Sequence, residues 1–398
     1  MLNKENNEQA PAISEDVIKI VDNIIRASIE AKASDIHFEP QESKMITRFR
    51  IDGSMNSFYE CDLSLYKSIL SRIKVMADLD LTGPAKPQEG NFRFYPNRMN
   101  KDHYVDLRIS IFPTSAGQVC VMRVLETKGR FASYSDLGFS EGQLGMLESM
   151  THKPNGLVLV TGPTGSGKST TLFTILNKLN DPDRVLSTLE DPVERKMDMV
   201  RQTEVNPKIG LDFAEGLRYL LRQDPDILMV GEIRDRETAK IAVQASITGH
   251  LVLATIHTNN AAGAIVRLIN MGIEPFMLSS ALKFVTGQRL VRKLCDECKT
   301  PTEYPPEFLE SKGLPKDITY YRAEGCSSCN NKGVKGRIGI HEVLPVTKVI
   351  EEAILLKPSD EQINKLAISE GMKTLQDAAL DKLVSGEISL EELIRVVE

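Results

Sequence analysis

The stretch Gly156-Leu-Val-Leu-Val-Thr161, followed by Gly162-Pro-Thr-Gly-Ser-Gly-Lys168-Ser169, decides the fold of this chain. Its first part is a continuous apolar run, as is typical of a buried strand in a parallel sheet. Its second part fits the pattern G-x-x-x-x-G-K-[ST], and the residues from Thr170 to Leu179 read as a helix. A strand, a glycine-rich turn and a helix in this order predict a phosphate-binding loop. A chance glycine-rich turn is the alternative, and the flanking elements argue against it.

This loop carries the chemistry of nucleotide binding. Its glycines let backbone N–H groups point at phosphates, and the helix N-terminus adds partial positive charge. We expect Lys168 to reach the β- and γ-phosphates of ATP and the Ser169 hydroxyl to bind Mg²⁺. The residues expected to contact the nucleotide are Gly162, Pro163, Thr164, Gly165, Ser166, Gly167, Lys168, Ser169 and Thr170.

Further apolar strands follow the phosphate loop. They are expected at Val185 to Leu189, Ile227 to Val230 and Leu251 to Ile256, with helical stretches between them. Strands that alternate with helices predict an α/β fold with a parallel sheet and crossover helices. A short strand at Arg337 to Val343 and C-terminal helices at 346–398 complete a predicted domain at 137–398.

The residues before this domain predict a smaller α+β domain at 14–127. A helix is expected from Ser14 and another from Leu65 to Leu79, and Asp52-Gly53 is a hairpin signal between strands. Polar residues 1–13 are expected to be a disordered leader, and 128–136 a linker.

Carboxylates and one histidine are candidates for the hydrolytic chemistry. Asp226-Ile-Leu-Met-Val-Gly-Glu232 is an apolar strand that ends in a carboxylate, and Glu232 is our candidate for activating water. Glu190 follows another buried strand, so it should open at the same sheet edge, where such sheets bind ligands. His250 and His257 flank one strand at opposite ends, and His257 lies at the carboxyl end. Solvated strand-end carboxylates and hydrogen-bonded structural histidines are the alternatives.

Four arginines are candidates for contacting phosphate. Arg218 and Arg222 are i,i+4 on an expected helix and should share a face. Arg108 and Arg123 lie on successive strand segments of the first domain, so they are adjacent if those strands pair. Ring ATPases bring cations to the γ-phosphate from a moving domain or a neighbour, although most exposed arginines only solvate a surface.

Two cysteine pairs predict a metal site. Cys295-x-x-Cys298 and Cys326-x-x-Cys329 lie within one segment, at 293–332. Four thiolates can occupy all positions of a tetrahedral Zn²⁺, which predicts a structural site rather than a catalytic one. A dithiol redox pair or unrelated thiols are the alternatives.

Composition excludes several classes of protein. Hydrophobic residues are 41% and charged residues 26%, as in ordinary globular proteins. The sequence has no apolar run of about eighteen residues, the length that a membrane-spanning helix needs. A net charge of -6 and the lack of a basic stretch with interleaved aromatic residues argue against nucleic-acid binding.

Together these motifs resemble the type II secretion and type IV pilus assembly ATPases of the secretion ATPase superfamily. The resemblance extends from about Ala33 to Val343. It implies a RecA-like ATPase domain preceded by a PAS-like α+β domain and followed by a zinc-binding insert. The residues that carry it are Ser34 to His37, Arg48 to Gly53, Gly162 to Thr170, Glu190 to Glu194, Leu221 to Asp235, Thr248 to Asn259 and Gln288 to Arg292.

The resemblance also implies partners and a location. It implies hexamers with mobile N-terminal domains, nucleotide contacts from the four arginines, and a cytoplasmic motor that reaches the inner membrane through a platform protein. The four-cysteine segment is usual in assembly and secretion ATPases, which favours these over a retraction motor. Many members carry a further N-terminal docking domain, which we do not expect ahead of Ser14. A nucleic-acid translocase and a non-hydrolysing regulatory nucleotide binder are the alternatives from other classes.

Overall fold

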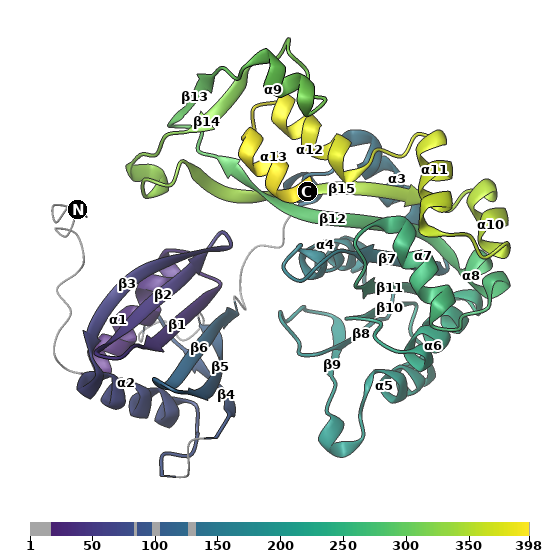
Figure 1. Ribbon diagram of the computed structural model, residues 1–398. Coiled ribbons are helices and arrows are strands. Elements are labelled where there is room, and N and C mark those ends of the chain that lie inside the picture. Colours follow the sequence, from purple (N-terminus) through teal and green to yellow (C-terminus); the bar gives the residue numbers. More distant parts are fainter. Residues whose placement is uncertain (1–16, 83–85, 98–103, 126–132, 398) are drawn as a thin grey trace. The chain divides into compact units, whose positions relative to one another are not determined.

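The computed structural model describes residues 17–82, 86–97, 104–125 and 133–397 (Figure 1). The chain divides into two compact units, with the boundary between residues 129 and 130. The expected leader, the expected helix start at Ser14 and residues 128–132 of the expected linker lie outside the described residues. Among the described helices, none combines the length and the apolar character needed to cross a membrane.

The N-terminal unit is an antiparallel sheet of six strands in the order β3-β2-β1-β6-β5-β4. Helices α1 (Val17–Glu30) and α2 (Leu63–Met76) pack against each other and against the apolar side of the sheet. The strands are β1 (Asp35–Pro40), β2 (Lys44–Ile51), β3 (Ser54–Asp62), β4 (Gln88–Phe94), β5 (Val105–Thr114) and β6 (Gly117–Leu125).

Period-two alternation explains this layering. Ile36 and Phe38 of β1 are fully buried in the helix-covered core, and their neighbours Asp35 and His37 belong to the opposite face. The expected hairpin turn at Asp52-Gly53 is confirmed, since it joins β2 to β3 with φ angles of 49° and 81°. The N-terminal unit therefore presents one apolar face to its own helices and one polar face without helices.

The C-terminal unit is built on a sheet of seven strands in the order β15-β12-β7-β11-β10-β8-β9. All neighbouring strands from β12 to β9 are parallel, and β15 runs antiparallel to β12 at one edge. The strands are β7 (Gly156–Thr161), β8 (Leu186–Glu190), β9 (Val200–Glu204), β10 (Ile227–Val230), β11 (Leu251–Ile256), β12 (Leu282–Leu294) and β15 (Val334–Pro345). The predicted parallel sheet is confirmed.

Helices cover both faces of this sheet. One core holds α3, α4 and the short helix η1, and another holds α5 to α8 with α10 and α11. The bounds are η1 (Tyr134–Leu137), α3 (Glu141–Thr151), α4 (Lys168–Leu179), η2 (Pro207–Ile209), α5 (Phe213–Leu220), η3 (Leu221–Gln223), α6 (Arg236–Ile247), α7 (Ala261–Asn270), α8 (Pro275–Ala281), α10 (Lys348–Leu355) and α11 (Asp360–Ser369).

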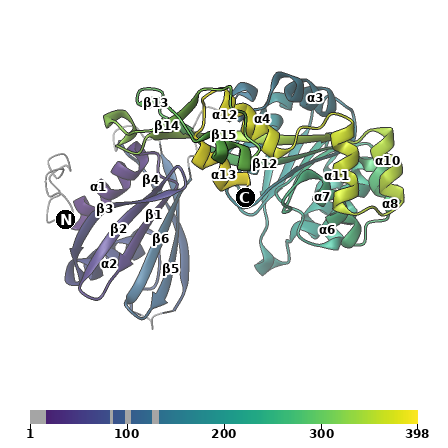
Figure 2. The ribbon, with the colours of Figure 1, turned by 45° about the horizontal axis from the view of Figure 1, so that its top comes forward.

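A separate small core joins the cysteine-containing segment to the last helices. It packs α12 (Leu375–Val384) and α13 (Leu390–Val397) beside β12 and a two-stranded hairpin, as Figure 2 shows. The hairpin comprises β13 (Lys299–Thr302) and β14 (Tyr320–Ala323), with α9 (Pro306–Ser311) between its strands and the short helix η4 (Ser327–Cys329) after it.

Within the seven-stranded sheet, the sequence located the central strands well and missed two others. The expected bounds of β7, β10 and β11 are confirmed, whereas β9 and β12 were not expected. Strand β9 is a polar, half-exposed edge strand, and β12 is interrupted by Lys283, Gln288 and Arg289, so neither has the continuous apolar pattern. Strand β15 is longer than the expected Arg337 to Val343 because it pairs with the whole length of β12.

Candidate nucleotide site and cysteine cluster

The phosphate loop lies between β7 and α4, as the sequence predicted. Gly162 has a φ of 148°, and a Cβ there would lie 2.4 Å from the carbonyl oxygen of Gln288, so only glycine fits. A helix leaves the N–H groups of its first turn without acceptors of its own, so those at the start of α4 can bind an anion. Lys168 Nζ donates to the carbonyl oxygens of Gly162 and Pro163 at 3.0 and 3.1 Å. The Lys168 ammonium group is thus hydrogen-bonded to the backbone of the loop itself.

Gln288 of β12 braces this loop. Its side-chain Nε2 donates to the carbonyl oxygen of Ser166 at 2.6 Å, and its Oε1 accepts from the Thr171 hydroxyl at 2.9 Å. All three side chains are buried. One residue therefore fixes both the phosphate loop and the first turn of α4.

Glu232 lies just beyond the carboxyl end of β10, where the sequence placed it. Its carboxylate forms an ion pair with Arg234, and its Oε2 lies 3.4 Å from His257 Nε2. Burial lowers the pKa of Lys168, and the negative charge of Glu232 opposes that shift, so the two groups act on each other. The structure thus brings together Lys168, Glu232 and His257.

Backbone hydrogen bonds hold Glu232 in place from both sides. The Gly231 N–H donates to the carbonyl oxygen of Leu189 at 2.8 Å, and the Ile233 N–H donates to that of Thr255 at 2.8 Å. The Thr255 hydroxyl donates to the carbonyl oxygen of Gly231 at 2.6 Å. Strands on either side of β10 thereby determine the direction of the segment that carries Glu232.

Glu190 is buried rather than solvated. It ends β8, is 3% exposed, and accepts hydrogen bonds from the Thr188 hydroxyl and, at 3.1 Å, from Gln202 Nε2. Burial raises the pKa of Glu190, and these two hydrogen bonds oppose the shift. A buried carboxylate with raised pKa at the carboxyl edge of a parallel sheet is a candidate for functional chemistry.

The loop from His257 to Asn260 is attached to the base of the phosphate loop. The Thr258 N–H donates to the Thr161 hydroxyl at 3.0 Å, and the two hydroxyl groups lie 2.7 Å apart. His250 Nδ1 lies 3.0 Å from the carbonyl oxygen of Ala245, at the other end of β11. The prediction that only His257 lies at the carboxyl edge is confirmed.

The prediction that Arg218 and Arg222 share one helix face is wrong. Helix α5 ends at Leu220, and Arg222 lies in η3, a tighter turn that ends at Asp224 with a φ of 51°. Asp224, the residue before Pro225, has a left-handed conformation, so the helical turns cannot continue past it. Arg218 pairs with Glu215 and Glu237, and Arg222 lies over the ring of Tyr219. In the described parts of the chain, neither arginine contacts the phosphate loop.

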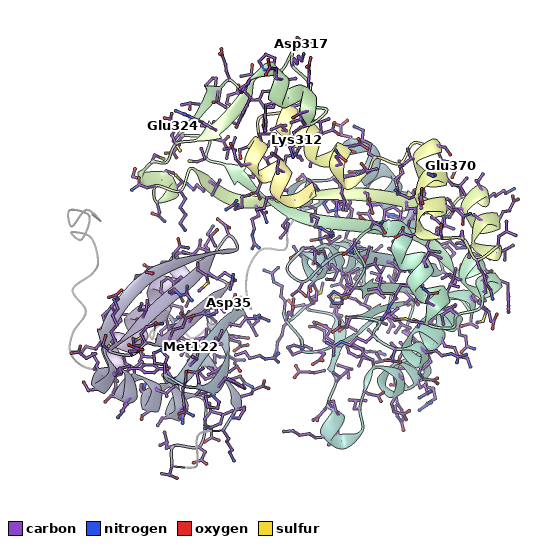
Figure 3. The ribbon with its side chains drawn as sticks, viewed as in Figure 1. Asp35, Met122, Lys312, Asp317, Glu324 and Glu370 are labelled. Atoms are coloured by element: carbon purple, nitrogen blue, oxygen red, sulfur yellow. The ribbon has the colours of Figure 1, made fainter. Side chains whose placement is uncertain are left out.

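Arg108 and Arg123 are direct cross-strand partners on β5 and β6, so the predicted adjacency is confirmed. Arg123 Nε donates to Asp35 Oδ1 at 3.1 Å, and Asp35 also lies 3.6 Å from Arg50 Nε (Figure 3 labels Asp35). Arg108 is exposed and forms no ion pair within the described residues. The helix-free face of the N-terminal sheet thus carries three arginines and one aspartate in register.

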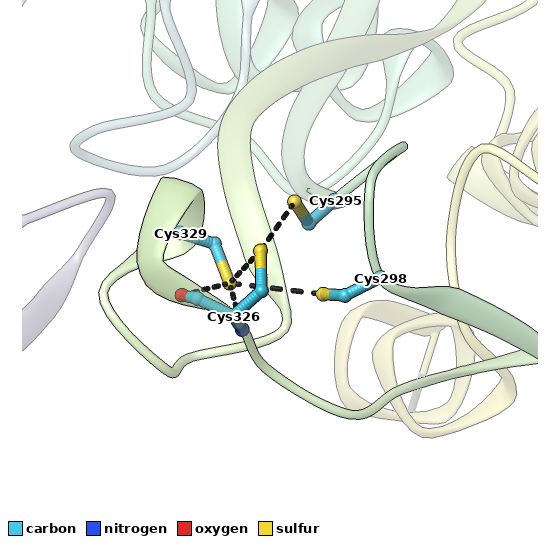
Figure 4. Close-up of side chains that lie close together, drawn as sticks. All are labelled: Cys295, Cys298, Cys326 and Cys329. Atoms are coloured by element: carbon cyan, nitrogen blue, oxygen red, sulfur yellow. Dashed lines mark hydrogen bonds between the residues drawn. The ribbon is translucent and has the colours of Figure 1, made fainter.

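The four cysteines lie together, as Figure 4 shows. Their sulfur atoms are all within 4.8 Å of one another, and three pairs are separated by 3.8 to 3.9 Å. Tetrahedral Zn²⁺ with Zn–S bonds of about 2.3 Å needs sulfur atoms about 3.8 Å apart. The N–H groups of Cys326 and Gly333 also donate to Cys329 Sγ at 3.2 Å. The cluster can therefore hold one metal ion.

Sequence reasoning missed Arg234 and Gln288 as members of the site. Arg234 also lies 3.5 Å from Asp191, and its ion pair with Glu232 raises the pKa of the guanidinium. Its spacing of two residues from Glu232 was a usable signal. Gln288 lies in a segment that resembles the family, but its role could not be predicted, because β12 was not expected and only its pairing with β7 brings Gln288 to the loop.

A phosphate loop at the carboxyl edge of a parallel sheet, with an acidic strand end beside it, defines a P-loop nucleotide-binding protein. A sequence model of the family described as "Type II/IV secretion system protein" matches residues 11–395. The chain belongs to this family.

Individual relatives agree with this assignment. The chain is 43% identical to "Type II secretion system protein E" of Dickeya dadantii over 382 residues, which are 96% of this chain and 76% of that protein. It is 44% identical to "Type IV pilus assembly ATPase PilB" of Thermus thermophilus over 385 residues, which are 96% of this chain and 43% of that protein. The chain therefore spans less than half of that PilB protein.

Two solved structures have the same fold. The crystal structure of the pilus retraction motor PilT with bound ADP gives a TM-score of 0.62 at 25% identity, covering 94% of this chain and 96% of that one. The ATPase DotB of Legionella pneumophila gives a TM-score of 0.72 at 20% identity, covering 98% of both chains. Because DotB is only 20% identical to this chain, its similarity shows the fold alone.

Proposed function

We propose that this chain is the ATP-hydrolysing motor that adds pilin or pseudopilin subunits in type IV pilus assembly or type II protein secretion. The observation that carries this proposal is the complete phosphate loop after β7, together with Glu232 after β10. Only β11 lies between these two strands in the sheet. The family and the names of its relatives supply the biological setting.

The site residues divide the hydrolytic chemistry between them. The phosphate loop binds ATP, and the Ser169 hydroxyl is the ligand that this chain offers to Mg²⁺. Lys168, which rests on loop carbonyls, turns to the β- and γ-phosphates. Glu232 polarises the attacking water, and His257 and Glu190 orient the groups around it. ATP and Mg²⁺ are thus the expected cofactors, with Mg²⁺ neutralising the charge that develops on the phosphates.

A ring completes the site in this proposal. A phosphate loop binds nucleotide, but triggered hydrolysis also needs a cation at the leaving group. Arg108 is exposed and without an ion pair in the described residues, which supports a role toward a ligand outside its own unit. Arg123, Arg218 and Arg222 are the other candidates. In a closed hexamer, a neighbouring subunit can supply such arginines through a head-to-tail interface.

The four cysteines hold one structural Zn²⁺ in this proposal. The sulfur separations match tetrahedral coordination, and four thiolates leave no open position for a substrate. The metal would tie the end of β12 to the segment before β15, and thus keep the hairpin segment folded.

The proposed partner is a platform protein of the inner membrane, and the proposed location is its cytoplasmic side. A retraction motor of the same fold is the second candidate, since PilT is a structural relative. Sequence identity of 43 to 44% to the assembly and secretion proteins, against 25% to PilT, favours assembly or secretion.

Phosphate release by two variants tests the hydrolytic roles. Glu232→Gln should bind ATP and lose at least about a hundredfold in turnover, the usual size of a general-base effect. Lys168→Ala should weaken nucleotide binding about tenfold or more, since bonds to charged groups contribute about 1.5–3 kcal/mol. Glu370→Gln, an exposed carboxylate outside the site, is the control. Unchanged turnover in Glu232→Gln would remove that residue from its role.

The ring is tested by dilution. Specific activity should rise with protein concentration as oligomers form, because each site needs its neighbour. Light scattering under the same conditions gives the oligomeric state. A dilute monomer with full activity would contradict the ring.

A further inference from the structure

A buried carboxylate lies at the far end of the loop that carries His257. Glu342 belongs to β15 and is 3% exposed. Its Oε1 accepts a hydrogen bond from the backbone N–H of Ala261. Ala261 is the first residue of α7 and follows the loop directly. Glu342 therefore fixes the point where the loop ends.

The N-termini of two helices partly offset the cost of burying the Glu342 carboxylate. The backbone N–H of Leu375, the first residue of α12, also lowers the pKa of this carboxylate. Helix N-termini stabilise anions, and Glu342 meets two of them. Burial and the charge of Asp360 raise the pKa of Glu342, whereas the backbone N–H groups of Ala261 and Leu375 and the charge of Arg289 oppose that shift.

Arg289 attaches the middle of the same loop. Its Nη2 donates to the carbonyl oxygen of Asn259 at 3.0 Å. Its Nη1 is buried, and no hydrogen-bond partner for it is found in the described parts of the chain. Burial lowers the pKa of Arg289, and the charge of Glu342 opposes this shift. The guanidinium, stabilised by the charge of Glu342, holds the loop at Asn259.

Gly287 makes room for this arrangement. It pairs with Glu342 on one side and with Thr161 on the other. A Cβ at Gly287 would lie 2.6 Å from Glu342 Oε1 and 3.1 Å from the Ala261 nitrogen. Any larger residue would push the carboxylate away from α7.

We propose that Glu342 and Arg289 are positioning residues that hold the His257–Asn260 loop and thereby keep His257 against Glu232. The loop is attached at Thr258 by Thr161, at Asn259 by Arg289 and at Ala261 by Glu342. Neither positioning residue needs to touch the nucleotide. The inference rests on the proposed roles of Glu232 and His257 in hydrolysis.

A second buried carboxylate, bonded to another arginine of β12, offers a matched control. Glu392 is also 3% exposed and accepts hydrogen bonds from Arg292 of β12, from its N–H at 2.7 Å and its Nε at 2.8 Å. This pair joins β12 to α13 and does not contact the His257 loop. Glu392 also accepts a hydrogen bond from Arg395 of its own helix, so Glu392→Gln reports what a buried carboxylate and its arginine partners contribute to stability.

Kinetics and hydrogen exchange of the whole chain, residues 1–398, test the proposal. Glu342→Gln keeps the volume and one acceptor oxygen, so the fold should survive. Its kcat should fall about tenfold, with KM for ATP within about threefold of wild type, because the loop acts on the chemical step. Amide exchange in residues 257–262 should also accelerate, a readout that needs no turnover. Glu392→Gln should change neither kcat nor this exchange.

A double-mutant cycle with His257 gives the sharper test. If Glu342 acts through His257, Glu342→Gln should cost less than about twofold in kcat in a His257→Ala background. A full tenfold loss of kcat in that background, or unchanged amide exchange of residues 257–262 in Glu342→Gln, would overturn this inference. The proposed function would not be affected by either result. If His257→Ala alone turns over ATP as fast as the wild type, the proposed role of His257 is wrong, and this inference fails with it.

Discussion

Replacing Gln288 with Leu should destabilise the nucleotide-free C-terminal unit by about 2–4 kcal/mol. The change removes the donor to the Ser166 carbonyl and the acceptor of the Thr171 hydroxyl. A buried polar group without a partner costs about 1–3 kcal/mol. The Thr171 hydroxyl can turn to a carbonyl of its own helix, which limits its share. Most of the loss should therefore come from the Ser166 carbonyl.

A second position on the same strand supplies the control. Thr286 lies two residues before Gln288, so both side chains belong to the same face of β12. Its hydroxyl is buried and has no hydrogen-bond partner in the part of the chain that the structure describes. Thr286→Val conserves the shape and removes an unsatisfied group, so the free energy of unfolding should stay constant or rise.

Thermal unfolding without nucleotide measures both variants. At about 2–4 °C per kcal/mol for a unit of this size, Gln288→Leu should lower Tm by roughly 5–15 °C. Binding of a fluorescent ATP analogue should weaken as well, because the loop must then be ordered by the ligand. If Gln288→Leu has the same Tm as the wild type, the hydrogen bonds of Gln288 do not stabilise the phosphate loop. The same conclusion follows if Thr286→Val lowers Tm as much as Gln288→Leu does.

Three further predictions concern other parts of the chain. Elemental analysis should find about one zinc ion per chain, lost in Cys326→Ser, and a folded wild type without metal would contradict the site. Arg108→Ala should cut turnover about tenfold or more at unchanged Tm, because Arg108 has no ion pair in the described residues, whereas Arg123→Ala should also lose the bond to Asp35. Full turnover in Arg108→Ala would refute the role of that arginine. Burial lowers the pKa of His341 to about 4. Since the unfolded value is about 6.5, stability should be complete above pH 6.5 and fall by about 3 kcal/mol toward pH 4. Urea unfolding at both pH values should give a smaller loss in His341→Phe, and an equal loss would exclude His341.

Local patterns explain what could be predicted about the nucleotide site. The phosphate loop, Glu232 and His257 each lie next to an apolar strand, and parallel strands bring their carboxyl ends to one edge. The adjacency of Arg108 and Arg123 could be inferred in the same way, since consecutive antiparallel strands usually pair. For these residues, position along the chain implies position in space.

The supporting residues could not be predicted, because their partners are distant in sequence. Gln288 reaches Ser166 only through the pairing of β12 with β7, and Glu342 reaches Ala261 only through that of β15 with β12. Neither strand pairing leaves a pattern in the sequence of the loop that it supports. The early end of α5 before Arg222 likewise followed from backbone geometry that side-chain periodicity does not contain.

The sequence by itself therefore determined the fold class, the phosphate loop, the acidic strand end and the cysteine pairs. Each of these depends on residues within a few positions of one another, so spacing and periodicity are sufficient. Only the tertiary structure decided that Glu190 is buried, that Arg234 pairs with Glu232, and that the cysteine sulfur atoms converge. These features arise from burial and long-range pairing, which depend on how the whole chain packs.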